Sequence, residues 1–520
     1  MDASPGTASA PTRYPRLCVS AASGGGGKTL LSLGLCRAFQ EAGLQVKPFK
    51  KGPDYIDAAW LGRAAGCAAT NLDPFFLPPP ELAALFAHSL DAAAPPDMPR
   101  MGLIEGNRGL YDGLDAAGTC STARLARGLA CPVVLCLDAT KMTRTAAALL
   151  SGLLDFEPGV RVCGVVFNRV GSPRHEAALR KAVSARLSVP VLGALPRLAR
   201  NPLPERHMGI ASIGGSLRDD ADALLDDLAT LVRGHVDMDA LLAAARGAAP
   251  LPDVETSQPP EPAPGERGER PLSQAGPTPP QDPAFGPAFR PASRKTGPRI
   301  GYVRDAAFWF YYPENLAALR AAGAEAVPLS LLDAPESGPA LWEELDGLYI
   351  GGGFPEDYLP QLSGSPHLGR LAALSRAGLP IYAECGGMIL LSRGMEREGV
   401  FWPLAGALPL RVVWTPRPQG LGYVDGVVRA VNPFFPVGWR LRGHEFHYSR
   451  CLRDADAPPP ALELSRGSGM GPHGEGAAGD GIACHRTWGA YTHIFAPAEP
   501  GWARNFVAVA AAWHAGRSRS

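Results

Sequence analysis

The sequence predicts two α/β domains, each organised around a mostly parallel β-sheet, and two observations support this fold class. First, apolar runs of strand length alternate with segments of helical spacing over residues 15–247, and the same alternation starts again over residues 298–515. Second, the intervening residues 248–297 are dense in Pro, Gly and charge, as is typical of a linker. Strands that alternate with helices favour parallel, doubly wound sheets. Residues 1–14 are expected to be a disordered tail.

Length, composition and charge limit the classes of protein to which this chain can belong. The 520 residues exceed what one hydrophobic core usually supports, and 46% hydrophobic with 19% charged residues suits packed globular domains. Lys plus Arg and Asp plus Glu are both 50, so the zero net charge favours neither nucleic acid nor an anionic membrane as a partner. The sequence has no signal-peptide pattern and no apolar run of about eighteen residues. Because the ten cysteines form no CxxC pair, a cytoplasmic protein with reduced thiols is expected.

The elements of the first domain follow from apolar patterning. Strands are predicted at LCVSAA, MGLIEG, CPVVLCLDAT and VCGVVFNRV. Helices are predicted at LLSLGLCRAFQEAG and HEAALRKAVSARL, because their apolar residues recur at helical spacing. The carboxyl ends of parallel strands share one edge of the sheet, and ligands of such folds bind there.

A glycine-rich loop between the first strand and the first helix predicts a phosphate site. The segment Ala22–Thr29 reads ASGGGGKT and has the strand–loop–helix context that a phosphate-cradling loop requires. In such loops the backbone N–H groups bind phosphates, the Lys reaches the β and γ oxygens, and the Thr hydroxyl ligates Mg²⁺. We therefore expect ATP and Mg²⁺ here, with Gly24, Gly25, Gly26, Gly27, Lys28 and Thr29 as ATP-binding residues.

Charged residues elsewhere in this domain are candidates for metal and substrate binding. The segment KPFKKGPDYID, Lys47 to Asp57, mixes cations with carboxylates, and a solvated charged turn is its alternative interpretation. The strand MGLIE ends in Glu105, at the ligand-binding edge of the sheet. The candidate Mg²⁺ ligands are Thr29, Asp54 and Glu105, and the candidate substrate-binding residues are Lys50, Tyr55, Asp57, Asp112, Ser121 and Thr122.

For some candidates the sequence leaves two roles open. Ser121 and Thr122 either line the substrate cleft or cap the helix that follows them. Asn168 ends the strand VCGVVFNRV and either hydrogen-bonds adenine, as an ATP-binding residue, or forms a turn.

The second domain carries a candidate nucleophile. After the strand RIGYVRD and the helical NLAALRAAG come strands at AVPLSL, DGLYIGGG and LPIYAECGG, the last of which runs into Cys385 and a helical MILLSRG. Cys385 therefore lies at a sharp strand-to-helix turn of the nucleophile-elbow type. The helix N-terminus is expected to lower the thiol pKa, and nearby backbone N–H groups are expected to form an oxyanion hole. Residues 400–450, rich in Gly, Pro and aromatic residues, suggest β-hairpins.

A thiolate that attacks an amide needs a histidine to carry the proton to the departing ammonia. We choose His493, which the apolar segment GAYTHIF frames, whereas His444 and His447 are alternatives as substrate contacts. Neither Glu384 nor Glu445 is assigned to a triad. The downstream histidines considered are His444, His447, His473, His485 and His493, and the candidate oxyanion-hole residues are Gly352, Gly353 and Gly386.

Taken together, these motifs resemble the cobyrinic acid a,c-diamide synthase family of corrinoid biosynthesis. The resemblance covers both predicted domains and rests on SGGGGKT, KPFKKGPDYID, IEGNRGLYDG, YIGGGFPE, YAECGGM, GHEFHYS and AYTHIF, which follow in the family's order. It implies an N-terminal domain similar to dethiobiotin synthetase and a C-terminal class I glutamine amidotransferase domain of the cobyric acid synthase type.

The resemblance also implies a reaction. ATP phosphorylates the a and c acetate carboxylates of cobyrinic acid, or of its metal-free relative, and ammonia attacks the acyl phosphates to give amides. Glutamine supplies the ammonia, with Cys385 matching the family's nucleophile and His493 the residue that activates it. The expected partner is a corrinoid small molecule, with a homodimer as an option.

Alternatives remain on the sequence alone. The family includes members that act on nickel sirohydrochlorin, and cobyric acid synthase amidates other side chains of a related ring. The linker is unusually long, and Ala22 stands where a glycine is common. A non-catalytic P-loop ATPase switch, the alternative from another class, predicts a lysine where this chain has Ser23 and has no need of Cys385 and His493.

Overall fold

The computed structural model describes residues 12–95, 97–199, 203, 205–206, 209–210, 218–252, 297–332, 339–455, 457–471 and 478–517. The chain divides into two compact units, Met1–Pro264 and Gly265–Ser520. This division falls within the predicted linker, of which residues 253–296 lie outside the described residues, as do residues 1–11 of the predicted tail.

The end of the predicted tail differs from the expectation of disorder. Tyr14 is 3% exposed, and its hydroxyl donates a hydrogen bond to Asp91 Oδ2 at 3.2 Å. The Thr12 N–H also donates to the carbonyl of Arg246. The folded part of the first unit therefore begins before residue 15, because the Tyr14 side chain is buried and bonded to Asp91 of α3 (Pro79–Ala93).

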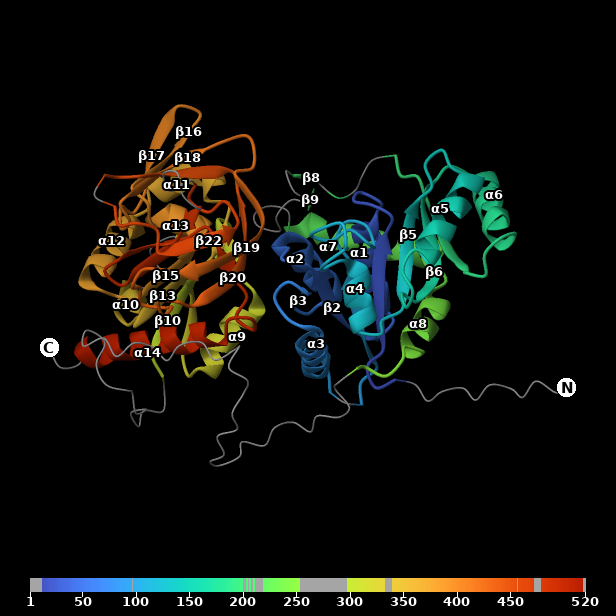
Figure 1. Ribbon diagram of the computed structural model, residues 1–520, viewed down its shortest axis with the longest axis horizontal. Helices are drawn as coiled ribbons and strands as arrows, with labels where there is room; N and C mark the ends of the chain where they lie inside the picture. Colours follow the sequence, from blue (N-terminus) through green and yellow to red (C-terminus); the bar gives the residue numbers. More distant parts are fainter. Residues whose placement is uncertain are drawn as a thin grey trace. The chain divides into compact units, whose positions relative to one another are not determined.

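A seven-stranded sheet in which every neighbouring pair is parallel forms the first unit (Figure 1). In chain order its strands are β1 (Arg16–Ala21), β2 (Gln45–Lys51), β3 (Thr70–Leu72), β4 (Arg100–Glu105), β5 (Val133–Asp138), β6 (Val162–Val170) and β7 (Val191–Pro196). Their spatial order is β3-β2-β4-β1-β5-β6-β7. Strand order reverses beside β1, so the loop after β1 opens at the switch point where such sheets bind ligands.

Helices alternate with these strands along the chain. They are α1 (Lys28–Glu41), α2 (Tyr55–Ala65), α3 (Pro79–Ala93), α4 (Thr122–Gly128), α5 (Arg144–Asp155), α6 (Pro173–Ser184), α7 (Arg218–His235) and α8 (Met238–Arg246), with a short pair β8 (Glu205–Arg206) and β9 (Gly209–Ile210) before α7. Helix α1 packs against α2 and α7, and Figure 1 shows α5 and α6 beside β5 and β6. All six residues of β1 are buried, as expected of a central strand covered on both faces.

The second unit has a six-stranded sheet. Its strands are β10 (Arg299–Val303), β12 (Glu325–Leu329), β13 (Gly347–Ile350), β15 (Ile381–Glu384), β24 (Ile482–Cys484) and β25 (Thr487–Ala490), in the order β12-β10-β13-β15-β25-β24. All neighbours are parallel except β24 and β25. The helical segments are α9 (Pro313–Ala321), α10 (Pro339–Glu343), the 3₁₀ turn η1 (Pro355–Asp357), α11 (Leu359–Ser363), α12 (His367–Ala377), α13 (Gly386–Leu391) and α14 (Pro500–Arg517).

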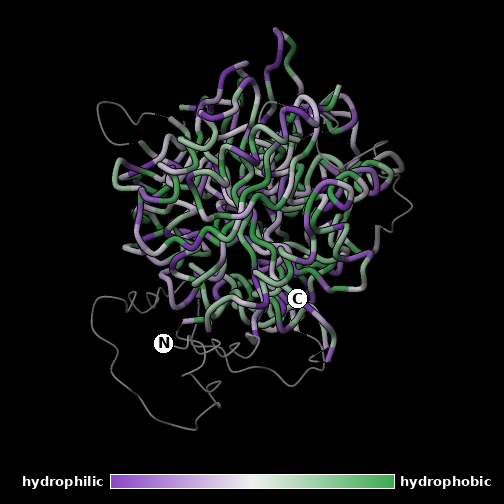
Figure 2. Tube along the Cα trace, turned by 90° about the vertical axis from the view of Figure 1, so that its right-hand side faces the viewer, coloured by the Kyte–Doolittle hydropathy of each residue, from purple (hydrophilic) through white to green (hydrophobic). Residues whose placement is uncertain are grey.

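Alternation along these strands builds two cores, one on each face. Leu348 and Ile350 belong to one buried cluster and Tyr349 to the other, as the two-residue period of a strand requires. Trp488 and Trp502 fill the second cluster. In Figure 2 the apolar stretches of the chain gather toward the inside of the trace, and polar stretches are more frequent at its rim.

Smaller, mostly antiparallel sheets complete the second unit, and they confirm the hairpins predicted for residues 400–450. One pairs β11 (Phe308–Phe310) with β14 (Gly352–Gly353). Another contains β16 (Gly394–Arg397), β17 (Val400–Pro403), β18 (Leu410–Trp414) and β21 (Ser449–Arg453). A third contains β19 (Gly420–Val428), β20 (Arg440–His447), β22 (Leu462–Arg466), β23 (Gly479–Asp480) and β26 (His493–Ile494).

Candidate functional site

The glycine-rich loop links the end of β1 to the start of α1. Gly27 has a φ of 99°, a left-handed conformation, and a Cβ there would lie 2.0 Å from Asn168 Nδ2. The Asn168 amide, on β6, donates a hydrogen bond to the carbonyl of Gly26 at 3.1 Å and so holds the loop in place. The Lys28 ammonium donates to the carbonyls of Ser23 and Arg108, at 3.2 and 2.6 Å. Burial lowers the pKa of Lys28.

A cluster of charged groups lies beside this loop, at the carboxyl ends of β2 and β4. Lys50 and Glu105 are paired in the register of these strands, and Lys50 Nζ lies 2.7 Å from Glu105 Oε1 and 2.6 Å from Asp57 Oδ2. The Thr29 hydroxyl donates to the same Glu105 Oε1 at 3.0 Å. The structure therefore brings together the loop and the segment Lys47–Asp57, which is not a solvated turn, since Lys50 is 2% exposed.

Burial and the neighbouring charges shift the pKa values of the groups in this cluster. Burial alone lowers the pKa of Lys50, but Asp57 and Glu105 outweigh it and hold that pKa above its ordinary value. Burial, together with repulsion from Asp57, raises the pKa of Asp54 to about 7. Burial also raises the pKa of Glu105, whose Oε2 accepts no hydrogen bond within the described residues.

The remaining candidates of the first unit have local structural roles. Ser121 caps α4 by accepting a hydrogen bond from the Arg124 N–H at 3.2 Å, and the Thr122 hydroxyl accepts one from the Asn107 N–H. Asp112 accepts from the Gly109 N–H at 2.8 Å. Ser121 and Thr122 are completely buried, which favours the capping alternative over substrate contact. Tyr55 is the first residue of α2, and Asp54 is its N-cap.

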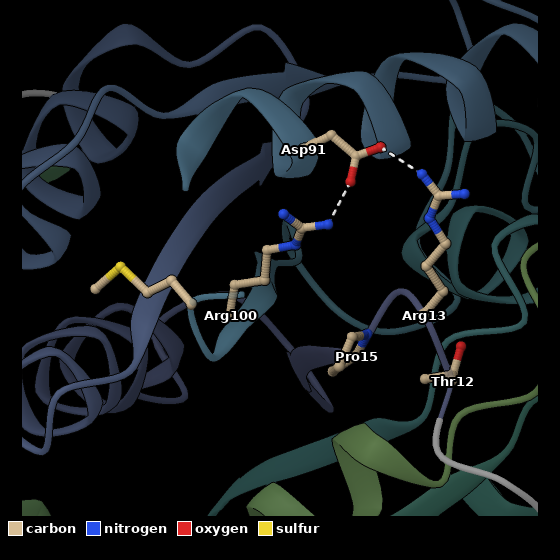
Figure 3. A pocket seen from close by; sticks show the side chains of 6 residues that line it. Thr12, Arg13, Pro15, Asp91 and Arg100 are labelled. Carbon is tan, nitrogen blue, oxygen red and sulfur yellow. Dashed lines mark hydrogen bonds and ion pairs between the residues drawn. The ribbon is translucent and has the colours of Figure 1, made fainter. Parts of the chain in front are cut away.

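A pocket of about 620 Å³ lies at the opposite edge of this sheet, where β1 and β4 begin (Figure 3). Asp91 lies 3.4 Å from Arg13 and 2.6 Å from Arg100, as the dashed lines in Figure 3 mark. Because the phosphate loop lies at the other end of β1, this pocket is distinct from the predicted phosphate site.

Cys385 lies between β15 and α13 with φ 46° and ψ −103°, a conformation unusual for a residue other than glycine. Its N–H donates to the carbonyl of Ala490 at 2.7 Å, and its thiol lies 3.5 Å from the Phe446 carbonyl. This geometry matches the predicted elbow. The thiol pKa differs from the expectation, because burial, followed by the nearby Glu356, raises it well above its ordinary value. The backbone N–H of Gly386, at the start of α13, lowers the thiol pKa, but burial outweighs it.

The predicted oxyanion-hole glycines lie together. A Cβ on Gly386 would lie 3.1 Å from the Gly353 nitrogen, and a Cβ on Gly352 would lie 2.4 Å from His493 Cε1. The backbone of β14 therefore approaches both the residue after Cys385 and the ring of His493, and only glycine leaves room for this approach.

His493 begins β26 and is completely buried. Its Nδ1 lies 3.5 Å from Glu384 Oε2, and its ring stacks on that of His444 with centroids 4.9 Å apart. His444 and His447, the alternatives for substrate contact, are 3% and 4% exposed. His447 is hydrogen-bonded to Ser449 O and Glu445 Oε2, at 2.7 and 3.3 Å.

Comparison with known proteins adds independent information. The family model of the CobQ/CobB/MinD/ParA nucleotide binding domain matches residues 17–210, and that of the CobB/CobQ-like glutamine amidotransferase domain matches residues 299–500. The "Cobyrinate a,c-diamide synthase" of Magnetococcus marinus is 38% identical over 496 residues, which cover 95% of this chain and 96% of the relative. The chain belongs to the cobyrinate a,c-diamide synthase family.

Other members of the cobyrinate a,c-diamide synthase family match over similar lengths. The "Hydrogenobyrinate a,c-diamide synthase" of Streptomyces coelicolor is 36% identical, with 95% of this chain and 97% of the relative covered. The "Cobyrinate a,c-diamide synthase" of Archaeoglobus fulgidus is 33% identical, with 96% and 98% covered. The resemblance and the fold class predicted from the sequence are confirmed, and the chain is an amide-forming ligase with a nucleotide-binding and a glutamine amidotransferase domain.

Sequence reasoning assigned no role to Glu384 and did not consider Asp480, although both lie near His493 in this diamide synthase fold. Glu384 reaches His493 because β15 pairs with β25 and places Glu384 opposite Ala490. Asp480 accepts hydrogen bonds from the N–H groups of Tyr491 and Thr492, at 3.0 and 2.8 Å, and so fixes the residues before His493. The position of Glu384 directly before Cys385 was the available signal, but the strand pairing that gives it meaning is not visible in the sequence.

Two features of the described residues limit what else the protein binds. No helix in the part of the chain that the structure describes is long and apolar enough to cross a membrane. In the same residues, no cluster of three or more His, Cys, Asp or Glu side chains is arranged to hold a metal ion. A metal site formed by Asp54 and Glu105 therefore needs further oxygen ligands, such as a hydroxyl, water or phosphate.

Proposed function

We propose that this chain converts the a and c acetate carboxylates of cobyrinic acid, or of its metal-free relative, into primary amides, using ATP and ammonia derived from glutamine. The carrying observation is the near full-length match to synthases named for this diamide product. The separate phosphate loop and cysteine–histidine sites support it, since the reaction needs carboxylate activation and ammonia release.

In the proposed glutaminase step, His493 takes the proton of the Cys385 thiol, and the thiolate attacks the carboxamide carbon of glutamine. The Gly352–Gly353 and Gly386 backbone N–H groups support the negative charge that develops on the carboxamide oxygen. The proton on His493 then passes to the departing ammonia, and water hydrolyses the thioester to glutamate.

In the proposed synthetase step, a carboxylate oxygen of the substrate attacks the γ-phosphorus of ATP, and ADP leaves. Lys28 and the N–H groups of the glycine-rich loop balance the charge on the phosphates. Ammonia then attacks the acyl phosphate, and the amide forms as inorganic phosphate and a proton leave. Substrate roles for Tyr55, Asp57 and Asp112 remain predictions.

Mg²⁺ fits the residues proposed to hold it. Glu105 presents a buried oxygen, Oε2, that accepts no hydrogen bond within the described residues, and Thr29 and Asp54 add oxygen ligands of the kind that Mg²⁺ prefers. Bound there, Mg²⁺ supplies positive charge to the β and γ phosphate oxygens. Lys50 balances the charges of Glu105 and Asp57.

Mass spectrometry tests the proposal. Purified protein with ATP, Mg²⁺, glutamine and cobyrinic acid is expected to show two successive mass losses, each matching the exchange of a carboxylic acid for an amide, and then to stop. Amidation of nickel sirohydrochlorin instead of cobyrinic acid would support the same reaction on a different substrate. Amidation of cobyrinate a,c-diamide, but not of cobyrinic acid, would favour cobyric acid synthase. A protein that binds ATP but amidates none of these substrates would favour the non-catalytic P-loop ATPase switch.

The raised pKa of Asp54 predicts that Mg²⁺ binding depends on pH. Because the pKa is about 7, Asp54 is largely protonated at pH 6 and ionised at pH 8, and only the ionised form binds Mg²⁺ well. The Mg²⁺ concentration that gives half-maximal amidation is expected to be about tenfold higher at pH 6 than at pH 8. Titrations at both pH values measure it, and an Asp54→Asn protein, which keeps a helix-capping side chain, should lose this pH dependence. Equal concentrations at both pH values would remove Asp54 from the metal site.

Gly352→Ala is expected to lower glutaminase activity by about 100-fold, because general acid–base catalysis contributes that much or more. The added methyl group would lie 2.4 Å from His493 Cε1 and would displace the ring. Glutamate release measures the effect. Gly369→Ala is the control, since a Cβ there meets no atom within 4 Å. Equal activity of both variants and wild type would show that the position of His493 is not critical.

A further inference from the structure

Three buried carboxylates surround the cysteine–histidine site of the second unit, and they differ in what they bind. Glu445 accepts hydrogen bonds from the N–H groups of Ser468 and Gly469 and contacts His447. Asp480 binds the backbone of Tyr491 and Thr492. Of these three carboxylates, Glu384 is the one whose oxygen lies within ion-pair distance of His493.

We propose that Glu384 is the positioning residue of the glutaminase site, which holds His493 through Nδ1 and leaves Nε2 as the nitrogen that exchanges a proton with Cys385. This inference rests on the proposed function and assigns a role in it. A carboxylate that accepts the Nδ1 proton fixes the imidazole tautomer and stabilises the imidazolium that forms when the thiol is deprotonated.

The orientation of the ring supports this assignment. Nδ1 faces Glu384 Oε2 at 3.5 Å, whereas Nε2 lies on the side of Gly352, where an added Cβ would be 3.2 Å from it. The same glycine strand approaches Gly386, the residue after Cys385. Nδ1 thus faces the Glu384 carboxylate, whereas Nε2 lies on the side of β14, the strand that also approaches the residue after Cys385. The 3.5 Å separation is longer than a usual hydrogen bond, and catalytic hydrogen bonds commonly shorten once substrate is bound.

Glu384 is itself held rigidly, as a positioning residue has to be. It is completely buried, and it accepts hydrogen bonds from the Tyr349 hydroxyl at 2.9 Å and from the Ile494 N–H at 3.1 Å. Asn315 reinforces this arrangement, since its amide donates to Tyr349 Oη at 3.2 Å and to the Ile494 carbonyl at 2.9 Å. The network ties α9, β13 and β15 to the strand that carries His493.

The chain order explains why this residue supplies the carboxylate. The two residues after His493 are Ile494 and Phe495, which are apolar and 1% exposed, so β26 itself offers no acid next to the ring. In β15, successive side chains point to opposite faces. Because Glu384 is the last residue of β15 and directly precedes Cys385, its side chain leaves the strand on a different face and lies beside His493.

Glu384→Gln tests the proposal. Glutamine keeps the size of the side chain, and its carbonyl oxygen can still accept the hydrogen bond of the Ile494 N–H in place of Oε1. Its NH₂ group would then replace Oε2, the oxygen that faces Nδ1 and accepts from Tyr349, and would favour the wrong tautomer. The kcat for glutamate release is expected to fall about 10³-fold with KM for glutamine nearly unchanged. Glu384→Asp, which restores the carboxylate with a shorter reach, is expected to recover about tenfold or more of that loss.

The matched control is Glu499→Gln. Glu499 is also a buried glutamate of the second unit, 3% exposed, and accepts hydrogen bonds from Trp439 Nε1 and the Arg442 N–H, at 2.7 and 2.9 Å. Its substitution removes a buried carboxylate in the same way, and kcat for glutamate release is expected to stay within about threefold of wild type.

The outcomes separate this inference from the proposed function. A wild-type protein that releases no glutamate would overturn the proposed glutaminase itself. If wild type releases glutamate and Glu384→Gln has the same kcat, the function stands and the role of Glu384 falls. If Glu384→Gln also loses ammonium-dependent amidation or melts well below wild type, the carboxylate serves the fold, which likewise overturns the proposal. A large loss of kcat with ammonium-dependent amidation retained, and partly recovered by Glu384→Asp, supports it.

Discussion

Cys385→Ala is expected to abolish glutamine-dependent amidation and to leave amidation with ammonium salts at the wild-type rate. The thiol is the nucleophile of the proposed glutaminase step alone, whereas the phosphate loop and its charged cluster belong to the other structural unit. Loss of an essential nucleophile costs at least about 10⁴-fold in rate. Glutamate release and amide formation, measured in parallel with glutamine and with ammonium chloride, give the two rates.

Cys484→Ala is the control for this experiment. Cys484 is a half-buried cysteine of β24 in the same unit, and its substitution is expected to change neither rate. A Cys385→Ala protein that keeps glutamine-dependent activity would exclude Cys385 as the nucleophile, and one that loses both activities would show that the two steps do not divide as proposed.

Lys28→Ala is expected to give the complementary result, with amidation lost from either nitrogen source and glutamate release retained. The ammonium of Lys28 is held at the start of α1 by the carbonyls of Ser23 and Arg108, where phosphate oxygens of ATP are proposed to bind. Removal of one preorganised charge of this kind costs about 10² to 10³-fold in the chemical step. Amide formation with ammonium salts and glutamate release without ATP are the two measurements.

Lys181→Ala, an exposed lysine of α6, controls for a simple loss of positive charge. Its amidation rate is expected to equal that of wild type. If Lys28→Ala amidates normally with ammonium, the phosphate loop is not the site of carboxylate activation, and the proposed synthetase step is wrong.

Local patterns predicted the fold well where the chain alternates between regular elements. The strand VCGVVFNRV coincides with β6, and the turn at Cys385 has the backbone geometry of an elbow, because a buried strand leads into it and two glycines follow it. The start of the first unit was placed too late, since the burial of Tyr14 depends on Asp91, a residue far along the chain.

The candidate site was predictable as a set of residues but not as a set of contacts. Lys50 and Glu105 meet because β2 and β4 are neighbours in register, and Glu384 meets His493 because β15 and β25 are. Strand order is a property of the whole sheet, so neither contact can be derived from spacing. The direction of the Cys385 pKa shift was missed for the same reason, because burial depends on packing.

The seclusion of Cys385 bears on how the protein withstands oxidants. Peroxide attacks cysteine as an exposed thiolate and converts it first to a sulfenic acid and then to acids that cells do not readily reduce. In this fold Cys385 is 4% exposed, and its raised pKa keeps the thiol protonated at neutral pH. The buried turn that presents Cys385 for the proposed attack on glutamine therefore also shields it from peroxide.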